Sequence, residues 1–220
     1  MADLREAIDA LYAAFSGVPR PGRIEGCPCC IDRKNVDVLL RGDPRTLNPD
    51  ELCSYAFSAF LTIGSVADYL YFLPRILEIT ATDAGWWPSI EVTGRAIRDA
   101  EPGRWDERQR RGLAEFLDAI VDAWIPTEEA YRLDGWLCAI AKMNFEVGPY
   151  LERIAKCPEA ILAIFEENAD TLPHGKLSNP YWEPPCPSHD RIVAWFASDE
   201  IARVPYEAYG YLIGRSDGSS

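Results

Sequence analysis

Apolar residues recur with helical spacing along almost the whole of this 220-residue chain. From Ala2 to Phe15 they follow the i, i+4, i+7, i+8, i+11 pattern of one buried helix face, while Asp3, Glu6 and Asp9 lie on the polar side. A glycine and a proline follow, as is typical of a helix end. Strand residues alternate with a period of two, so this pattern restricts the chain to helices.

Capping sequences mark where several helices begin. Asn48-Pro49-Asp50-Glu51 combines an N-cap, proline at the first helical position and an acid three residues after the cap, and this helix is expected to end at Gly64. Ser65 and Asp68 repeat the capping arrangement for a helix through Glu78. Pro74 lacks an amide hydrogen, so it either kinks that helix or begins a second segment.

The same signals predict an all-α fold, a single-domain array of about nine or ten antiparallel helices arranged as an irregular bundle or a short solenoid. The domain is expected over residues 1–215, with irregular loops at 17–47 and 172–187 and a flexible tail at 216–220. A short apolar run inside the first loop, Val36 to Leu40, is interpreted as a strand or an extended connector. Later helix starts are assigned to caps at Thr127, Ser188 and Ser198.

The charge composition limits the partners. Lys and Arg total 22 against 35 Asp and Glu, which makes the formal charge −13 and the isoelectric point about 4.6. Nucleic acid and anionic membranes are poor partners for such a chain, whereas a basic protein partner is compatible with it. Acidity that serves only solubility is the alternative. No secretory signal or membrane span is visible, so a cytoplasmic location with reduced thiols is expected.

Two distant clusters carry potential metal ligands. Cys27 and Cys30 have the two-residue spacing with which one turn can direct two thiolates at a zinc ion, and Cys186 and His189 repeat that spacing. Together they predict a closed structural zinc site, with Cys29 as an alternative ligand. Unligated cysteines and a redox-active thiol pair remain the other interpretations of the first cluster.

The remaining cysteines and the acidic pairs carry weaker signals. Cys53, Cys138 and Cys157 lie within expected helices beside apolar stripes, where cysteine behaves as a small hydrophobe. The adjacent pairs Glu128/Glu129 and Glu166/Glu167 point to different sides of a helix and are expected at the solvated surface. No phosphate-binding loop, dinucleotide motif or nucleophile elbow is present, so no catalytic residue is assigned.

Two aromatic pairs lie in expected turns beside proline. Trp86-Trp87 and Tyr181-Trp182 are not explained by a helix stripe, so they either bind a partner or anchor their loops.

The first part of the chain resembles a family of small uncharacterised bacterial proteins. The resemblance rests on Gly26-Cys27-Pro28-Cys29-Cys30, then Leu52-Cys53-Ser54-Tyr55-Ala56-Phe57, then Phe72-Leu73-Pro74-Arg75-Ile76-Leu77-Glu78, and it covers roughly the first 80 residues. Glu51 stands where the family has Asp, and residues 62–65 replace its Thr-Trp-Gly-Asp. The resemblance implies no activity and has no counterpart for Cys186 and His189.

These observations favour a non-enzymatic, cytoplasmic protein-binding protein. By analogy, small acidic helical proteins include immunity-type inhibitors that neutralise a bacterial toxin through a basic toxin domain. A structural zinc-binding scaffold or regulator is the first alternative, and a carboxylate-based enzyme is the second.

The zinc hypothesis has a direct test. Metal analysis of the gently purified protein is expected to find about one equivalent of zinc, since four ligands close one site. The Cys27→Ser variant is expected to lose the zinc, whereas Cys138→Ser is the matched control because Cys138 is not one of the four ligands. A zinc content below about a tenth of an equivalent in the unmodified protein would contradict the hypothesis.

Overall fold

A computed structural model describes residues 3–27, 33–183 and 185–210 of the chain. Over these residues it contains eleven α-helices, four short 3-10 helices and no β-strand, which confirms the all-α prediction. The chain divides into two compact units, Met1–Ile120 and Val121–Ser220, which we call unit 1 and unit 2. The expectation of a single domain stays a prediction.

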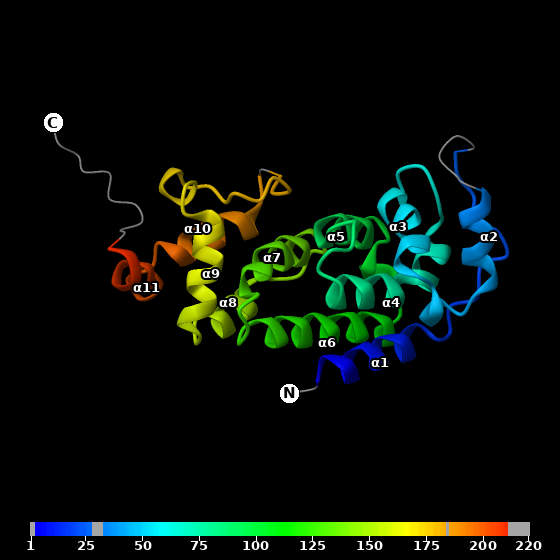
Figure 1. Ribbon diagram of the computed structural model, residues 1–220, viewed down its shortest axis with the longest axis horizontal. Helices are drawn as coiled ribbons and strands as arrows, with labels where there is room; N and C mark the ends of the chain where they lie inside the picture. Colours follow the sequence, from blue (N-terminus) through cyan, green and yellow to red (C-terminus); the bar gives the residue numbers. More distant parts are fainter. Residues whose placement is uncertain (1–2, 28–32, 184, 211–220) are drawn as a thin grey trace. The chain divides into compact units, whose positions relative to one another are not determined.

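Unit 1 is organised around α4 (Val66–Thr82), which packs against α1 (Leu4–Phe15), α3 (Pro49–Ser58) and α5 (Ile90–Asp99) (Figure 1). The other elements are α2 (Arg33–Arg41), the first part of α6 (Glu107–Trp124), and the 3-10 turns η1 (Pro44–Thr46) and η2 (Pro102–Arg104). The fully buried side chains of its core include Leu11, Leu39, Leu52, Tyr69, Phe72, Leu73, Ile76, Leu77, Ile97, Leu113, Phe116, Leu117 and Ile120.

The two capping predictions in unit 1 are confirmed. The Asn48 side chain accepts the amide hydrogen of Asp50 at 2.9 Å, and Glu51 accepts that of Asn48 at 3.1 Å. Ser65 and Asp68 form the same reciprocal pair at the start of α4. These bonds satisfy amides that have no partner inside the helix, which explains why both starts were predictable.

Pro74 lies inside α4, which continues as one helix from Val66 to Thr82. Proline removes one backbone hydrogen bond, yet the Pro74 ring is buried among the other apolar side chains of α4. Packing of the long apolar helix face therefore offsets the missing bond.

The interpretation of residues 17–47 as a loop is wrong in its second half. Residues Arg33–Arg41 form α2, and Pro44–Thr46 form η1. Val36, Leu39 and Leu40 have the i, i+3, i+4 spacing of a helix face, and Leu39 is buried. A run of only five residues fits a strand and a helix equally, and tertiary packing decided between them. The helix begun at Asn48 also ends earlier than expected, at Ser58 rather than Gly64.

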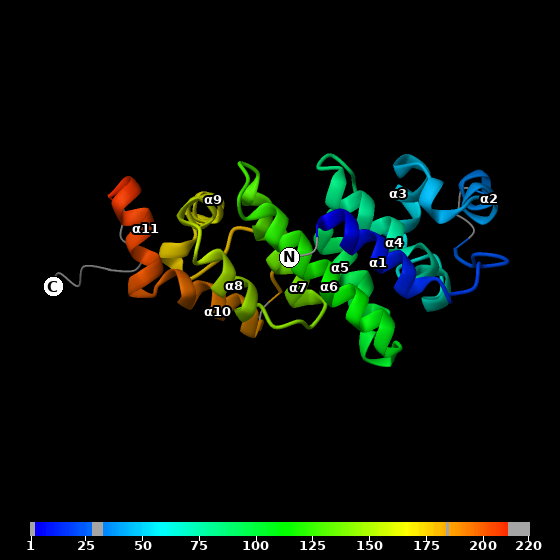
Figure 2. The same ribbon diagram turned by 90° about the horizontal axis from the view of Figure 1, so that it is seen from below.

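Unit 2 contains α7 (Leu133–Lys142), α8 (Gly148–Ile154), α9 (Pro158–Asn168), α10 (Pro187–Phe196) and α11 (Asp199–Tyr209), with η3 (Ala130–Arg132) and η4 (Leu172–His174). Helix α9 packs against α7, α8, α11 and η3, and Figure 2 shows it beside α11. The core side chains are Leu133, Trp136, Leu137, Ile140, Val147, Leu151, Ile154, Ile161, Ile164, Phe165, Ile192, Phe196 and Ile201.

Two of the expected caps in unit 2 are wrong. The Thr127 hydroxyl donates to the Trp124 carbonyl at 2.9 Å, and the N-cap residue of α7 is Arg132, so Thr127 follows the end of α6 and does not begin α7. Cys186, not Ser188, is the N-cap residue of α10. Ser198 is the N-cap residue of α11, but its hydroxyl donates backwards to the Trp195 carbonyl at 2.7 Å. A serine or threonine hydroxyl can bond in either direction, and the sequence does not distinguish the two.

Of the other two segments in the predicted domain layout, residues 172–187 are irregular apart from η4 and the start of α10 at Pro187, with residue 184 outside the description. The expected tail at 216–220 lies outside the described residues. No helix in the described ranges is both long and apolar enough to cross a membrane.

Close contact between α1 and α6 generates a stability prediction. A Cβ atom at Gly112 would lie 2.6 Å from the Cβ of Ala14. Gly112→Ala is therefore expected to destabilise the protein by about 1–3 kcal/mol, because overpacking exceeds the ~1 kcal/mol gain in helix propensity. Urea denaturation measures the difference. The matched control is Gly103→Ala, where no atom lies within 4 Å, and it is expected to change stability by less than ~0.5 kcal/mol. Equal or higher stability of Gly112→Ala would show that α1 and α6 are not packed this closely.

Candidate functional site

The four predicted zinc ligands fall in different parts of the chain. Cys29 and Cys30 lie outside the described residues, Cys27 belongs to unit 1, and Cys186 and His189 belong to unit 2. Residues Glu25 to Cys27 are held by two backbone hydrogen bonds: the Cys27 amide donates to the Thr62 carbonyl, and the Gly64 amide donates to the Glu25 carbonyl, both at 2.8 Å. The zinc site stays a prediction.

His189 makes protein contacts through both ring nitrogens. Its Nε2 lies 3.3 Å from the amide nitrogen of Leu177, and its Nδ1 lies 3.0 Å from a carboxylate oxygen of Asp190. The ring also meets the edge of Trp182, with centroids 5.8 Å apart. A zinc ion would have to replace one of these hydrogen bonds. Over the described part of the chain, no group of three or more His, Cys, Asp or Glu side chains is arranged to hold a metal ion.

A buried amide fastens the irregular segment after α9 to the core of unit 2. Asn168 is fully buried, and its Nδ2 donates to Asp134 at 2.8 Å and to the Ile164 carbonyl at 2.9 Å. Its Oδ1 accepts the amide hydrogen of Ser178 at 2.7 Å, and Asn179 donates to the other oxygen of Asp134. The segment that precedes Cys186 is therefore positioned by a polar network that no local sequence pattern indicates.

In each aromatic pair one residue is half-buried and the other is exposed. Trp86 is half-buried and donates from Nε1 to the Pro49 carbonyl at 3.0 Å, which anchors its turn to the start of α3. Trp87 is 55% exposed and stacks on Phe57 with centroids 4.2 Å apart. Tyr181 is exposed, whereas Trp182 is half-buried beside His189. A role in partner binding stays a prediction for all four.

The three cysteines expected within helices differ in burial, and Cys157 lies outside a helix, as the N-cap residue of α9. Cys138 is fully buried, as core filling requires. Cys53 and Cys157 are only half-buried, and burial raises the pKa of the Cys53 thiol, with the nearby Asp50 carboxylate adding to the shift. A raised thiol pKa disfavours the reactive thiolate, so this environment does not activate Cys53.

The acidic pairs are exposed, and one of them lies beside exposed tyrosines. Glu128/Glu129 and Glu166/Glu167 are all at the surface. On α9 and α11, the Tyr209 hydroxyl donates to Glu166, and the Tyr209 ring stacks on Phe165. The hydrogen bond to Glu166 raises the pKa of Tyr209, so this phenol stays neutral. We use the name acid-tyrosine face for five exposed residues near the ends of α9 and α11, namely Glu166, Glu167, Asp170, Tyr206 and Tyr209. Glu167 lies on a different side of α9 from Glu166, and Asp170 follows the end of α9.

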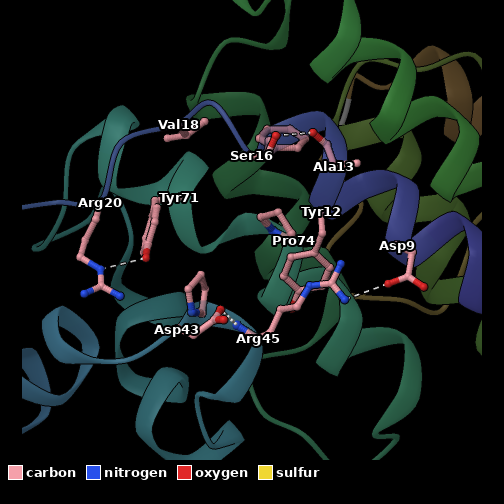
Figure 3. A pocket seen from close by; sticks show the side chains of 12 residues that line it. Asp9, Tyr12, Ala13, Ser16, Val18, Arg20, Asp43, Arg45, Tyr71 and Pro74 are labelled. Atoms are coloured by element: carbon pink, nitrogen blue, oxygen red, sulfur yellow. Dashed lines mark hydrogen bonds and ion pairs between the residues drawn. The ribbon is translucent and has the colours of Figure 1, made fainter.

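Unit 1 has a cavity of about 480 Å³ between α1, η1 and α4, which Figure 3 shows from close by. Tyr12, Phe15, Tyr71 and two prolines supply apolar surface, and Arg20 and Arg45 supply positive charge. A second hollow, of about 540 Å³, has Asp9 and Arg45 in common with the first. Arg45 bonds Asp9 at 2.8 Å, so this ion pair separates the two hollows.

A network that includes two ion pairs forms one wall of the cavity. The Arg45 guanidinium lies 4.0 Å from the centre of the Tyr12 ring, and the Tyr12 hydroxyl donates to Glu78 at 2.6 Å. Glu78 also accepts from Arg75 at 2.8 Å, and Arg75 donates to the Leu47 carbonyl. Burial raises the pKa of Tyr12 well above its usual range, and the bond to Glu78 adds to the shift. Tyr12 therefore presents an uncharged ring to the cavity at any physiological pH.

The cavity could not be predicted from the sequence, for a physical reason. Its lining comes from α1, the segment around Arg20, η1 and α4, so the residues meet only through tertiary packing. Tyr12 belongs to an ordinary amphipathic stripe, and Arg20 and Arg45 lie in a segment interpreted as a loop. The Phe-Leu-Pro-Arg-Ile-Leu-Glu segment does contain Pro74, Arg75 and Glu78, which form or support the cavity wall.

Comparison with known proteins identifies no relative. No family model matches the chain, and no curated protein or solved structure is significantly similar to it. A proposal about function must therefore rest on the all-α fold and on the side chains of this chain.

The buried network of Asn168 generates a pH-dependent prediction. Asn168→Asp places an oxygen where Nδ2 now donates to Asp134, so two carboxylates would face each other. We expect a loss of about 2–4 kcal/mol at pH 7, measured by urea denaturation. The introduced carboxyl has a raised folded-state pKa, so the loss shrinks as the pH falls toward 5 and the group is protonated.

The matched control for this variant is Asn179→Asp, at the less buried member of the same network. It is expected to cost less than Asn168→Asp, because water can reach and solvate its carboxylate. Equal stability losses for the two variants, or a loss at Asn168 that does not vary between pH 5 and 7, would contradict the role assigned to Asn168.

Proposed function

We propose that this chain is a non-enzymatic protein-binding protein whose acid-tyrosine face on unit 2 docks onto a basic protein partner. The observation that carries the proposal is the placement of exposed tyrosines on α11 near three acids at the end of α9, none of which forms an ion pair within the described part of the chain. A basic domain of a bacterial toxin has the required chemistry, and an immunity-type inhibitor is the function that follows.

The charge of the chain is concentrated in unit 2. Residues 121–220 contain 16 acidic and 8 basic side chains, a formal charge of −8, whereas residues 1–120 contain 19 and 14, a formal charge of −5. In unit 1 many exposed acids are paired with arginine, as in the ion pairs of Asp9, Asp37, Glu101, Glu107 and Glu115. Unit 2 therefore has the stronger field for attracting a basic surface.

Two exposed tyrosines on α11 can make direct contacts with a partner that the negative charge attracts. Tyr206 is 48% and Tyr209 55% exposed, and they are three positions apart on α11, so they share one side of the helix. Tyrosine rings supply large contact area with few rotatable bonds, and they attract arginine and lysine through their π faces. Glu166 holds the Tyr209 ring in place through its hydrogen bond, which lowers the entropy lost on binding.

The two alternative functions, a zinc-binding scaffold and a carboxylate-based enzyme, have less structural support. The zinc scaffold rests on the spacing of its ligands, and its test is the metal analysis described above. A carboxylate-based enzyme requires converging acids, and both adjacent glutamate pairs are solvated at the surface.

The experiment compares the full chain with a triple variant, Glu166→Gln, Glu167→Gln and Asp170→Asn. Each protein is immobilised, exposed to a lysate of the source organism, and the captured proteins are identified by mass spectrometry. One identified protein, purified separately, is then titrated against both forms. We expect the triple variant to bind about tenfold or more weakly, and binding by the unmodified chain to weaken as salt rises.

A variant on unit 1 is the matched control. Glu107→Gln, Glu115→Gln and Asp118→Asn remove three exposed acids from α6 and are expected to leave the affinity nearly unchanged. Equal weakening by both triple variants would mean that net charge alone matters. Retained affinity in the α9 variant would contradict the proposed face.

A further inference from the structure

The cavity of unit 1 holds two arginines whose hydrogen-bonding capacity is largely unused. Arg20 donates from Nε to the Tyr71 hydroxyl at 3.1 Å and from Nη2 to the Gly42 carbonyl at 2.6 Å. A guanidinium has five N–H donors, so three of those of Arg20 have no partner among the described residues. Neither contact is to a carboxylate, so the positive charge of Arg20 is not neutralised there.

The contacts of Arg45 orient its guanidinium but use only one of its N–H donors among the described residues. Its guanidinium stacks over the Tyr12 ring and donates once, to Asp9 at 2.8 Å. The Asp9 and Arg45 side chains are 62% and 48% exposed, so this ion pair contributes little energy and can open at small cost. Asp43, the other acid of the lining, already accepts the backbone amide of Arg45 at 3.0 Å.

The rest of the lining suits a flat apolar group. Tyr12, Phe15 and Tyr71 contribute rings, and Pro44 and Pro74 contribute aliphatic surface. Figure 3 shows Tyr71 beside Arg20 on one side of the cavity and Tyr12 beside Arg45 on the other, with Pro74 between the two tyrosines. A volume of about 480 Å³ lies within the range of small-molecule sites and accommodates a single-ring ligand.

We propose that this cavity binds a small aromatic acid, with its ring against Tyr12, Tyr71 and Pro74 and its anionic group on Arg20. Arginine matches carboxylate and phosphate geometry with two parallel donors, and both anions satisfy that chemistry. The overall charge of −13 repels anions elsewhere, so binding depends on these local donors. The site lies in unit 1 and is independent of the proposed protein-binding face on unit 2.

Calorimetric titration of the full chain with four probes tests the site. Benzoate and phenyl phosphate have both a ring and an anion, benzyl alcohol has only the ring, and inorganic phosphate has only the anion. We expect at least one of the first two to bind with a dissociation constant of about 0.1–1 mM, and the other two probes at least tenfold more weakly. Whether benzoate or phenyl phosphate binds more tightly identifies the natural anionic group.

Variants of Arg20 connect the binding to the cavity. Arg20→Met is expected to weaken binding about 10- to 100-fold, and Arg20→Lys less, because it keeps the charge but loses the paired donors. Arg104→Met is the control, since Arg104 is 81% exposed on η2 and lines neither hollow. Circular dichroism verifies that each variant is folded, and Arg20→Lys replaces Arg20→Met if the latter is not.

The proposal is overturned if neither aromatic acid binds at about 10 mM, or if the Arg20 variants bind as tightly as the unmodified chain. If benzyl alcohol and benzoate bind with equal affinity, the anionic group does not contribute to binding, and recognition of an acid is contradicted. If inorganic phosphate and phenyl phosphate bind with equal affinity, the ring does not contribute, and recognition of an aromatic ligand is contradicted.

Discussion

The ion pair between Arg75 and Glu78 on α4 is the interaction on which the organisation of unit 1 depends. Arg75 donates twice to the Leu47 carbonyl, at 3.0 and 2.8 Å, and so fixes the segment that follows η1. Glu78 accepts from Arg75 and from Tyr12 of α1. Both side chains are more than two-thirds buried, so loss of either partner would leave a poorly solvated charge. One turn of α4 thereby positions both walls of the cavity, and Arg45 with them.

In unit 2 a neutral side chain, the Asn168 amide, links separate elements of the fold. The Asn168 amide joins α9 to Asp134 near the start of α7 and to the irregular segment at Ser178. That segment leads to Cys186 and His189, and the bonds from Asn179 to Asp134 and from the Leu177 amide to His189 also hold it. The two units consequently present different chemistry: a cavity with unused arginine donors in unit 1, and exposed acids with tyrosines in unit 2. The proposed ligand and the proposed partner address separate surfaces and can be tested separately.

Local hydrogen bonds explain which parts of the fold could be predicted from sequence. The capping pairs at Asn48 and Ser65 were recognisable because both members lie within four residues of each other. Thr127 and Ser188 offered the same residue types, but their local sequence does not specify which backbone group the hydroxyl bonds. The helix α2 was missed because its apolar run is too short for periodicity to separate a helix from a strand. The zinc site is predicted only from the spacing of its candidate ligands in the sequence, because Cys29 and Cys30 lie outside the described residues.

The sequence by itself determined that the chain is helical, where most helices begin, and which faces are apolar, because these properties arise from contacts within a few residues. Only the tertiary structure decided that Pro74 stays inside one helix, that Trp86 anchors while Trp87 is exposed, and that Tyr12, Arg20 and Arg45 line one cavity. These outcomes depend on side chains from elements separated by tens of residues. Burial and packing select among such arrangements, and no local pattern encodes that choice.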